Sequence, residues 1–90
     1  MDIATLRQEI DRLDLRLVEL LNQRARAAQQ IGRLKRNTLM PIYEPDREKV
    51  IMENVSAATR GPLSAAQMQY IFAHIIDMMR QLQKDEILNQ

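Results

Sequence analysis

Several residue types are absent or scarce in this chain, and each absence argues against a class of function. Among 90 residues there is no cysteine, which excludes disulfide scaffolds and thiolate chemistry. A single histidine argues against a metal site built from several histidines. There is no apolar run of about 18 residues and no basic leader followed by an apolar segment, so we expect neither a membrane span nor a signal peptide. We therefore expect a soluble cytoplasmic protein without a metal site.

An excess of one charge is also lacking. Thirteen lysines and arginines stand against twelve acidic residues, which gives a formal net charge of +1. Such a chain has no overall field that would draw it to nucleic acid or to an anionic membrane, so any anion site must be a local cluster of basic side chains. Ninety residues form one domain at most, and its small core makes help from a partner chain plausible.

Apolar residues recur every three or four positions along the first third of the chain, which predicts one long amphipathic helix. We place this helix at residues 2–37, because Asp2 can cap its start and the segment NTLMPIYEP, with two prolines, ends it. The apolar stripe consists of positions 3, 6, 10, 13, 17, 20, 27, 31 and 34.

Two shorter helices are predicted after the long one, at residues 45–59 and 64–88. Pro45 suits the first position of a helix, and the segment TRGP breaks the chain before the third one. Ser64 and Gln67 have the spacing of a capping box at the start of that third helix. With no strand proposed, the predicted fold class is all-α, with three helices in a single domain over residues 1–90.

The predicted first helix is too long for a compact monomer. About 35 residues at 1.5 Å each extend roughly 50 Å, whereas a compact chain of this size has a radius of gyration of about 12 Å. Part of the apolar stripe would therefore overhang. A second copy lying antiparallel would cover it, so we expect an intertwined helical homodimer.

Basic residues interrupt the apolar stripe of the first helix. Arg24 shares the stripe with Ile31, and its neighbours three and four residues away are uncharged, so a buried Arg24 implies an anion. Lys35, three turns on, lies on the same face about 16 Å away. Arg7 lies roughly 25 Å from Arg24 along the helix and can join its site only from another chain. Alternatives remain open at this point for all three residues. Arg7 could form a plain surface pair with Asp11, one turn away. Arg24 could pair with a carboxylate of the second helix or reach solvent, and Lys35 could be solvated.

Polar residues on the other two helices are further candidates. Glu44 and Glu48 continue an inward stripe of the second helix, although Glu48 could simply be a favourable charge at a helix start. Gln83 lies on an apolar face of the third helix, where a buried amide needs a hydrogen-bond partner. Because it lies near the end of that helix, the amide could instead be exposed to solvent.

The ordered segments LRQEIDRLDLRLVELLNQRARAAQQIGRLK, PIYEPDRE, GPLS and IFAHIIDMMRQLQ cover nearly the whole chain. Together they resemble the all-helical bacterial chorismate mutases, which occur free or at the amino end of prephenate dehydratase or dehydrogenase enzymes. The resemblance implies an isomerase that rearranges chorismate to prephenate in the biosynthesis of phenylalanine and tyrosine. It also implies an intertwined dimer with two sites and no cofactor.

The resemblance assigns roles to basic residues of this chain. Arg7 resembles the arginine that the partner chain lends to the site, and Arg24 resembles the arginine that clamps a substrate carboxylate within it. Lys35 resembles the lysine that binds a carboxylate and the ether oxygen. Arg47 and Glu48 match the Arg-Glu pair of the family, in which the glutamate accepts a hydrogen bond from the ring hydroxyl of the substrate.

The same resemblance implies roles for three further positions, two of which depart from the family pattern. Gln83 resembles the glutamine that donates to the ether oxygen. Glu44 occupies what is often an aspartate, which is a conservative change. Met79 lies where a serine often contacts the ring carboxylate, and a thioether cannot replace a hydroxyl donor.

Three other interpretations remain open from the sequence. An isochorismate pyruvate-lyase has the same fold and also needs a cationic pocket. A non-catalytic helical dimerisation module predicts that Arg24 pairs with a protein carboxylate and that no pocket exists. A nucleic-acid-binding helix would use the outward residues Arg26, Arg33 and Arg36 but lacks an aromatic stacking platform.

Overall fold

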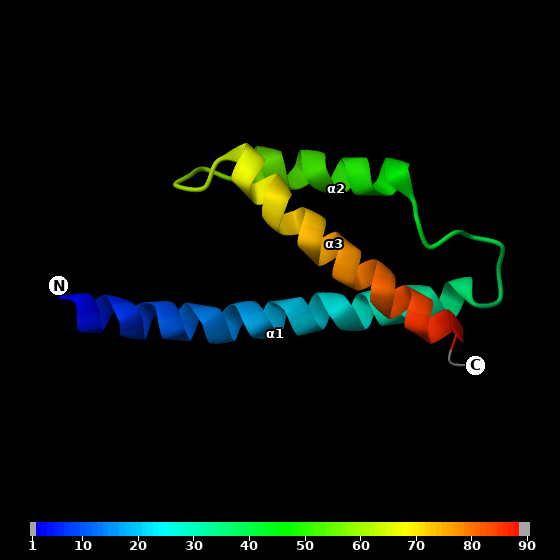
Figure 1. Ribbon diagram of the computed structural model, residues 1–90, viewed down its shortest axis with the longest axis horizontal. Helices are drawn as coiled ribbons and strands as arrows, with labels where there is room; N and C mark the ends of the chain where they lie inside the picture. Colours follow the sequence, from blue (N-terminus) through cyan, green and yellow to red (C-terminus); the bar gives the residue numbers. More distant parts are fainter. Residues whose placement is uncertain (1, 89–90) are drawn as a thin grey trace.

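The computed structural model describes residues 2–88 and consists of three helices joined by two connectors (Figure 1). Helix α1 spans Ile3–Lys35, α2 spans Pro45–Ala58 and α3 spans Ala65–Leu88. Residues 2–88 contain no strand, so the prediction of three helices without a sheet is confirmed for this range. The predicted bounds of the helices overran the observed ones by one or two residues at some ends. Within residues 2–88, none of the helices combines the length and the hydropathy of a membrane-spanning segment.

Local sequence signals account for where the helices begin. The Asp2 carboxylate accepts a 2.8 Å hydrogen bond from the backbone N–H of Thr5, which caps α1. Pro45 lies at the start of α2, where its missing N–H costs nothing. Before α3, Ser64 and Gln67 exchange side-chain and backbone hydrogen bonds of 2.9 and 3.1 Å, so the predicted capping box is present.

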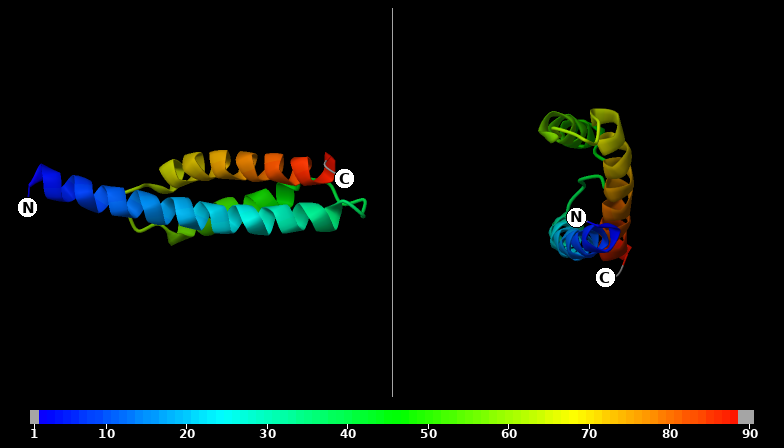
Figure 2. Two further views of the ribbon diagram at one scale, coloured as in Figure 1. Left: turned by 90° about the horizontal axis from the view of Figure 1, so that it is seen from below. Right: turned by 90° about the vertical axis from the view of Figure 1, so that its left-hand side faces the viewer.

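The three helices form an open arrangement. Helix α3 packs against both α1 and α2, which lie on the same side of it (Figure 2). The radius of gyration is 16.2 Å and the longest dimension is 54 Å, against about 12 Å for a compact chain of this length. The buried apolar residues are only three, Ala28, Ile76 and Met79, within residues 2–88. A single chain therefore has a very small core.

The first half of α1 extends beyond the other two helices (Figures 1 and 2). Its apolar stripe is uncovered there, since each of the six side chains Ile3, Leu6, Ile10, Leu13, Leu17 and Leu20 is at least 43% exposed. Contiguous apolar surface of this kind is rare on stable monomers and marks an interaction surface.

The crossing of α1 and α3 depends on Gly32. A Cβ atom at this position would lie 2.9 Å from the Cα of Gln83 and 3.1 Å from its carbonyl oxygen. Glycine thus allows the two helix backbones to approach closely. Beside this contact, Arg33 and Arg36 both bind Glu86 of α3 through its carboxylate, and Arg36 also donates to its carbonyl oxygen. Arg36 was expected to point outward, but this pairing leaves it half-buried.

Candidate active site

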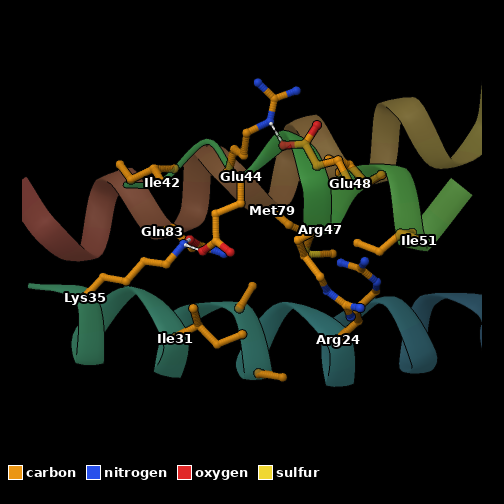
Figure 3. Close-up of a pocket in the computed structure, with 14 residues that line it drawn as sticks. Arg24, Ile31, Lys35, Ile42, Glu44, Arg47, Glu48, Ile51, Met79 and Gln83 are labelled. Atoms are coloured by element: carbon orange, nitrogen blue, oxygen red, sulfur yellow. Dashed lines mark hydrogen bonds and ion pairs between the residues drawn. The ribbon is translucent and has the colours of Figure 1, made fainter. Parts of the chain in front are cut away.

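A cavity of about 350 Å³ lies between the second half of α1, the end of the first connector with the start of α2, and the second half of α3 (Figure 3). This volume is within the range of small-molecule pockets. Ala28 and Ile76 are buried in its apolar part. Seven of the eight residues singled out from the sequence line it, namely Arg24, Lys35, Glu44, Arg47, Glu48, Met79 and Gln83.

Arg7 is the eighth predicted residue, and a single chain does not bring it to the cavity. It is exposed on the first half of α1. It lies seventeen positions before Arg24 on the same continuous helix, which corresponds to roughly 25 Å. The cavity of one chain is therefore lined without Arg7.

Lys35 of α1 is held at one end of the cavity by one group from each of the other two parts of its wall. Its side chain is only 4% exposed, so the alternative of a solvated lysine is wrong. The ammonium forms a 2.5 Å ion pair with Glu44 and donates a 3.0 Å hydrogen bond to Oε1 of Gln83 (Figure 3). Because an ammonium can only donate, this contact directs the amide oxygen of Gln83 toward Lys35 and leaves its NH2 group to donate elsewhere.

Glu48 is paired with a residue that the sequence analysis missed. Nε of Arg80, on α3, lies 3.2 Å from Oε2 of Glu48, although it makes no hydrogen bond of good geometry within residues 2–88. The Arg80 guanidinium also lies over the ring of Tyr43 at 5.4 Å. Arg80 is one turn from both Ile76 and Gln83, so helical spacing alone could have placed it on the cavity side. From the sequence alone, Asp77, three residues earlier on the same helix, is an equally good partner for Arg80.

Arg24 and Arg47 lie together at the other end of the cavity (Figure 3). No ion pair joins either of them to a carboxylate within residues 2–88, so the alternative in which Arg24 pairs with the second helix is wrong there. Burial lowers the pKa of Arg24, and the positive charge of Arg47 lowers it further. Two neighbouring guanidiniums without a counter-charge form a site for an anion.

The charges around the cavity do not balance. Its wall carries four basic side chains, Arg24, Lys35, Arg47 and Arg80, and two acidic ones, Glu44 and Glu48. Each acid is paired with one base, so the two unpaired guanidiniums leave two positive charges. The cavity therefore has the charge and the bidentate donors to hold a small dianion.

Comparison with known proteins agrees with these features. The family described as chorismate mutase type II matches residues 6–84. The bifunctional chorismate mutase/prephenate dehydratase of Aquifex aeolicus is 33% identical over 87 residues, which cover 92% of this chain and 24% of that protein. The chain thus spans about a quarter of the length of the first curated relatives it matches.

Two solved structures have the same fold. Chorismate mutase form II of Thermus thermophilus superposes with a TM-score of 0.88 at 32% identity and covers 91% of this chain and 93% of its own. Chorismate mutase of Helicobacter pylori in complex with prephenate superposes with a TM-score of 0.88 at 28% identity, covering 98% and 96%. Since the family match extends over nearly the whole described chain, this protein belongs to the type II, all-helical chorismate mutase family.

Proposed function

We propose that this chain is a chorismate mutase that converts chorismate to prephenate. The observation that carries the proposal is the cavity whose two unpaired guanidiniums, Arg24 and Arg47, leave two positive charges. Chorismate carries two carboxylates, so its charge and its hydrogen-bond acceptors match this wall. Membership of the family, and the prephenate complex of the Helicobacter pylori relative, support the same substrate.

The chemistry explains why such a cavity is sufficient. The reaction is a unimolecular rearrangement in which the ether C–O bond breaks while a C–C bond forms, so all atoms and electrons stay within the substrate. It requires neither a nucleophile nor a general base. A protein accelerates it by holding a compact conformer and by stabilising negative charge that develops on the ether oxygen.

We assign the carboxylate clamp to Arg24 and Arg47, together with Arg7 of a second copy. Guanidiniums suit this task, because each can bind a carboxylate through two parallel hydrogen bonds. Met79 provides apolar wall in this arrangement.

Lys35 and Gln83 are assigned to the ether oxygen. Two of the three donors of the Lys35 ammonium are directed at Glu44 and Gln83, and the third remains for the substrate. The NH2 group of Gln83 adds a neutral donor. Glu44 holds Lys35 in place, and Glu48 accepts the ring hydroxyl.

The proposal includes a homodimer with two shared sites. The exposed apolar stripe of α1 between Ile3 and Leu20 needs a cover, and an antiparallel second copy supplies it. The same packing can bring Arg7 of one copy toward Arg24 of the other, over a distance that a single helix cannot span. The dimerisation-module alternative required a paired Arg24 and no pocket, and neither condition holds for residues 2–88.

The proposal is tested by supplying the purified chain with chorismate and, separately, with isochorismate. Chorismate loss is followed by absorbance, and prephenate and pyruvate are measured as products. We expect prephenate from chorismate without release of pyruvate, and nearly complete loss of turnover in Arg24→Ala. Pyruvate release from isochorismate alone would instead identify a lyase, and no reaction with either substrate would identify a non-catalytic module.

A further inference from the structure

Arg80 connects α3 to both α2 and the first connector. It projects from α3, and its Nε lies 3.2 Å from Oε2 of Glu48 on α2. Its guanidinium lies over Tyr43 of the first connector at 5.4 Å from the ring centroid. Nη2 lies 3.8 Å from Asp77, a largely exposed residue of the same helix. These contacts hold the guanidinium at one place although its side chain is still 36% exposed.

The carboxylate that Arg80 faces is an unfavourable group in a cavity for a dianion. The Glu48 side chain is 22% exposed and lines the cavity, so without a counter-charge it would repel an anionic ligand. Arg80 is the basic residue paired with Glu48 within residues 2–88, since Lys35 is engaged by Glu44. The Arg80–Glu48 ion pair therefore offsets the repulsion between Glu48 and an anionic ligand, while Glu48 remains available as a hydrogen-bond acceptor.

The ion pair also orients Glu48. Nε of Arg80 faces Oε2 at 3.2 Å, and no hydrogen bond from residues 2–88 to Oε1 is formed. A carboxylate has more acceptor positions than one donor can occupy, so Oε1 stays available to a hydroxyl. Restraining Oε2 also restrains Oε1, because both oxygens belong to one rigid carboxylate. The Glu48 side chain therefore loses less conformational entropy when a ligand binds.

We propose that Arg80 is a positioning residue that neutralises and orients Glu48, so that Glu48 accepts the ring hydroxyl of the dianionic substrate. This inference rests on the proposed function. It assigns Arg80 no direct contact with the reacting atoms. A substitution of Arg80 should therefore change kcat/KM only by changing the charge or the orientation of the Glu48 carboxylate.

A double-mutant cycle tests this dependence. The variants are Arg80→Met, Glu48→Gln and their combination, each assayed for kcat/KM with chorismate. We expect Arg80→Met alone to lower kcat/KM by about tenfold, in line with the loss of a charge-assisted contact. In the Glu48→Gln background the same substitution should cost less than about twofold, because a neutral amide neither repels the dianion nor needs a cation.

Two further variants separate charge from packing. Arg80→Lys keeps a cation near Glu48 and should retain more activity than Arg80→Met. Lys84→Met removes a positive charge one turn further along α3, at an exposed position outside the cavity, and should leave kcat/KM nearly unchanged. If Arg80→Met does not fold, the inference is judged on Arg80→Lys in the two backgrounds. The smaller loss expected there must again disappear with Glu48→Gln.

The outcomes distinguish this inference from the function on which it rests. A wild-type chain without turnover of chorismate would overturn both. An active wild type in which the Arg80 substitution costs the same factor with glutamate and with glutamine at position 48 would overturn the inference alone. That result would mean that Arg80 contacts the substrate directly or supports the fold.

Discussion

Nζ of Lys35 donates a 3.0 Å hydrogen bond to Oε1 of Gln83, although the two residues lie 48 positions apart on different helices. The contact forms where Gly32 lets α1 and α3 approach closely. It places an ammonium and an amide donor side by side at one end of the cavity. In the proposed mechanism both groups face the oxygen that becomes negative as the ether bond breaks.

The substitution Gln83→Glu should make activity depend on pH. An ionised carboxylate beside the ether oxygen would oppose the developing negative charge, whereas a protonated one would restore a donor. The turnover of this variant should be poor at neutral pH and rise on acidification toward about pH 4.5, near the unperturbed glutamate pKa of about 4.3. The nearby Lys35 and Glu44 shift the midpoint in opposite directions.

The matched controls for this pH profile are the wild type and Gln83→Ala, neither of which has a titrating group at position 83. Neither should show the rise. A profile of Gln83→Glu that runs parallel to the wild type between about pH 4.5 and 8 would show that Gln83 does not contact the reacting oxygen.

Substitution of Lys35 by alanine should lower kcat more than it raises KM. The ammonium is most valuable when charge develops in the transition state, and loss of one such donor typically costs about 100-fold or more in kcat. Steady-state kinetics with chorismate measure the split. Met79→Ser is the comparison, because a hydroxyl there should affect mainly substrate binding. Unchanged kcat with a raised KM in Lys35→Ala would contradict the assigned role.

Gly32→Ala should destabilise the chain even though alanine is the better helix former. The added Cβ would lie 2.9 Å from the Cα of Gln83, so α3 must move away. We expect a net loss of about 1–3 kcal/mol in the free energy of unfolding, as for other overpacked contacts, together with reduced kcat. Denaturant unfolding measures the change in the free energy of unfolding, and the chorismate assay measures the change in kcat. Gln30→Ala, at an exposed position of the same helix, should change neither appreciably.

The open shape of the single chain predicts an obligate dimer. The six side chains of the apolar stripe of α1 from Ile3 to Leu20 are exposed in one copy, and the core of one chain is too small to hold it together in water. Analytical ultracentrifugation should show a dimer across micromolar concentrations, with dissociation coupled to unfolding. Detection of a stable, folded monomer at these concentrations would contradict the prediction.

The helices could be predicted from the sequence because their signals are local. The period of the apolar stripe, the Asp2 cap, Pro45 and the Ser64–Gln67 box each act within a turn or two. The same periodicity placed Arg24 on the inner face. Its unpaired state, and the cavity that it lines together with residues of α2 and α3, could be established only once α2 and α3 were positioned.

Features that depend on the connector and on helix crossing were not predictable in this way. Residues 38–43 show no period, so nothing local indicated that the chain would return to bring Glu44 onto Lys35 and Tyr43 onto Arg80. The role of Gly32 depends on where α3 crosses α1, which the spacing of residues along one helix does not reveal. The functional roles of the cavity residues stay predictions.

The central claim is that this chain forms a chorismate mutase site shared between two copies, and activity of mixed dimers tests it most directly. Arg7→Ala and Arg24→Ala homodimers should each be nearly inactive. When the two variants are unfolded together and refolded at equal concentration, prephenate formation should recover to about a quarter of the wild-type rate, since half of the dimers are mixed and one of their two sites is intact. Mixed dimers that form and stay inactive would contradict the account.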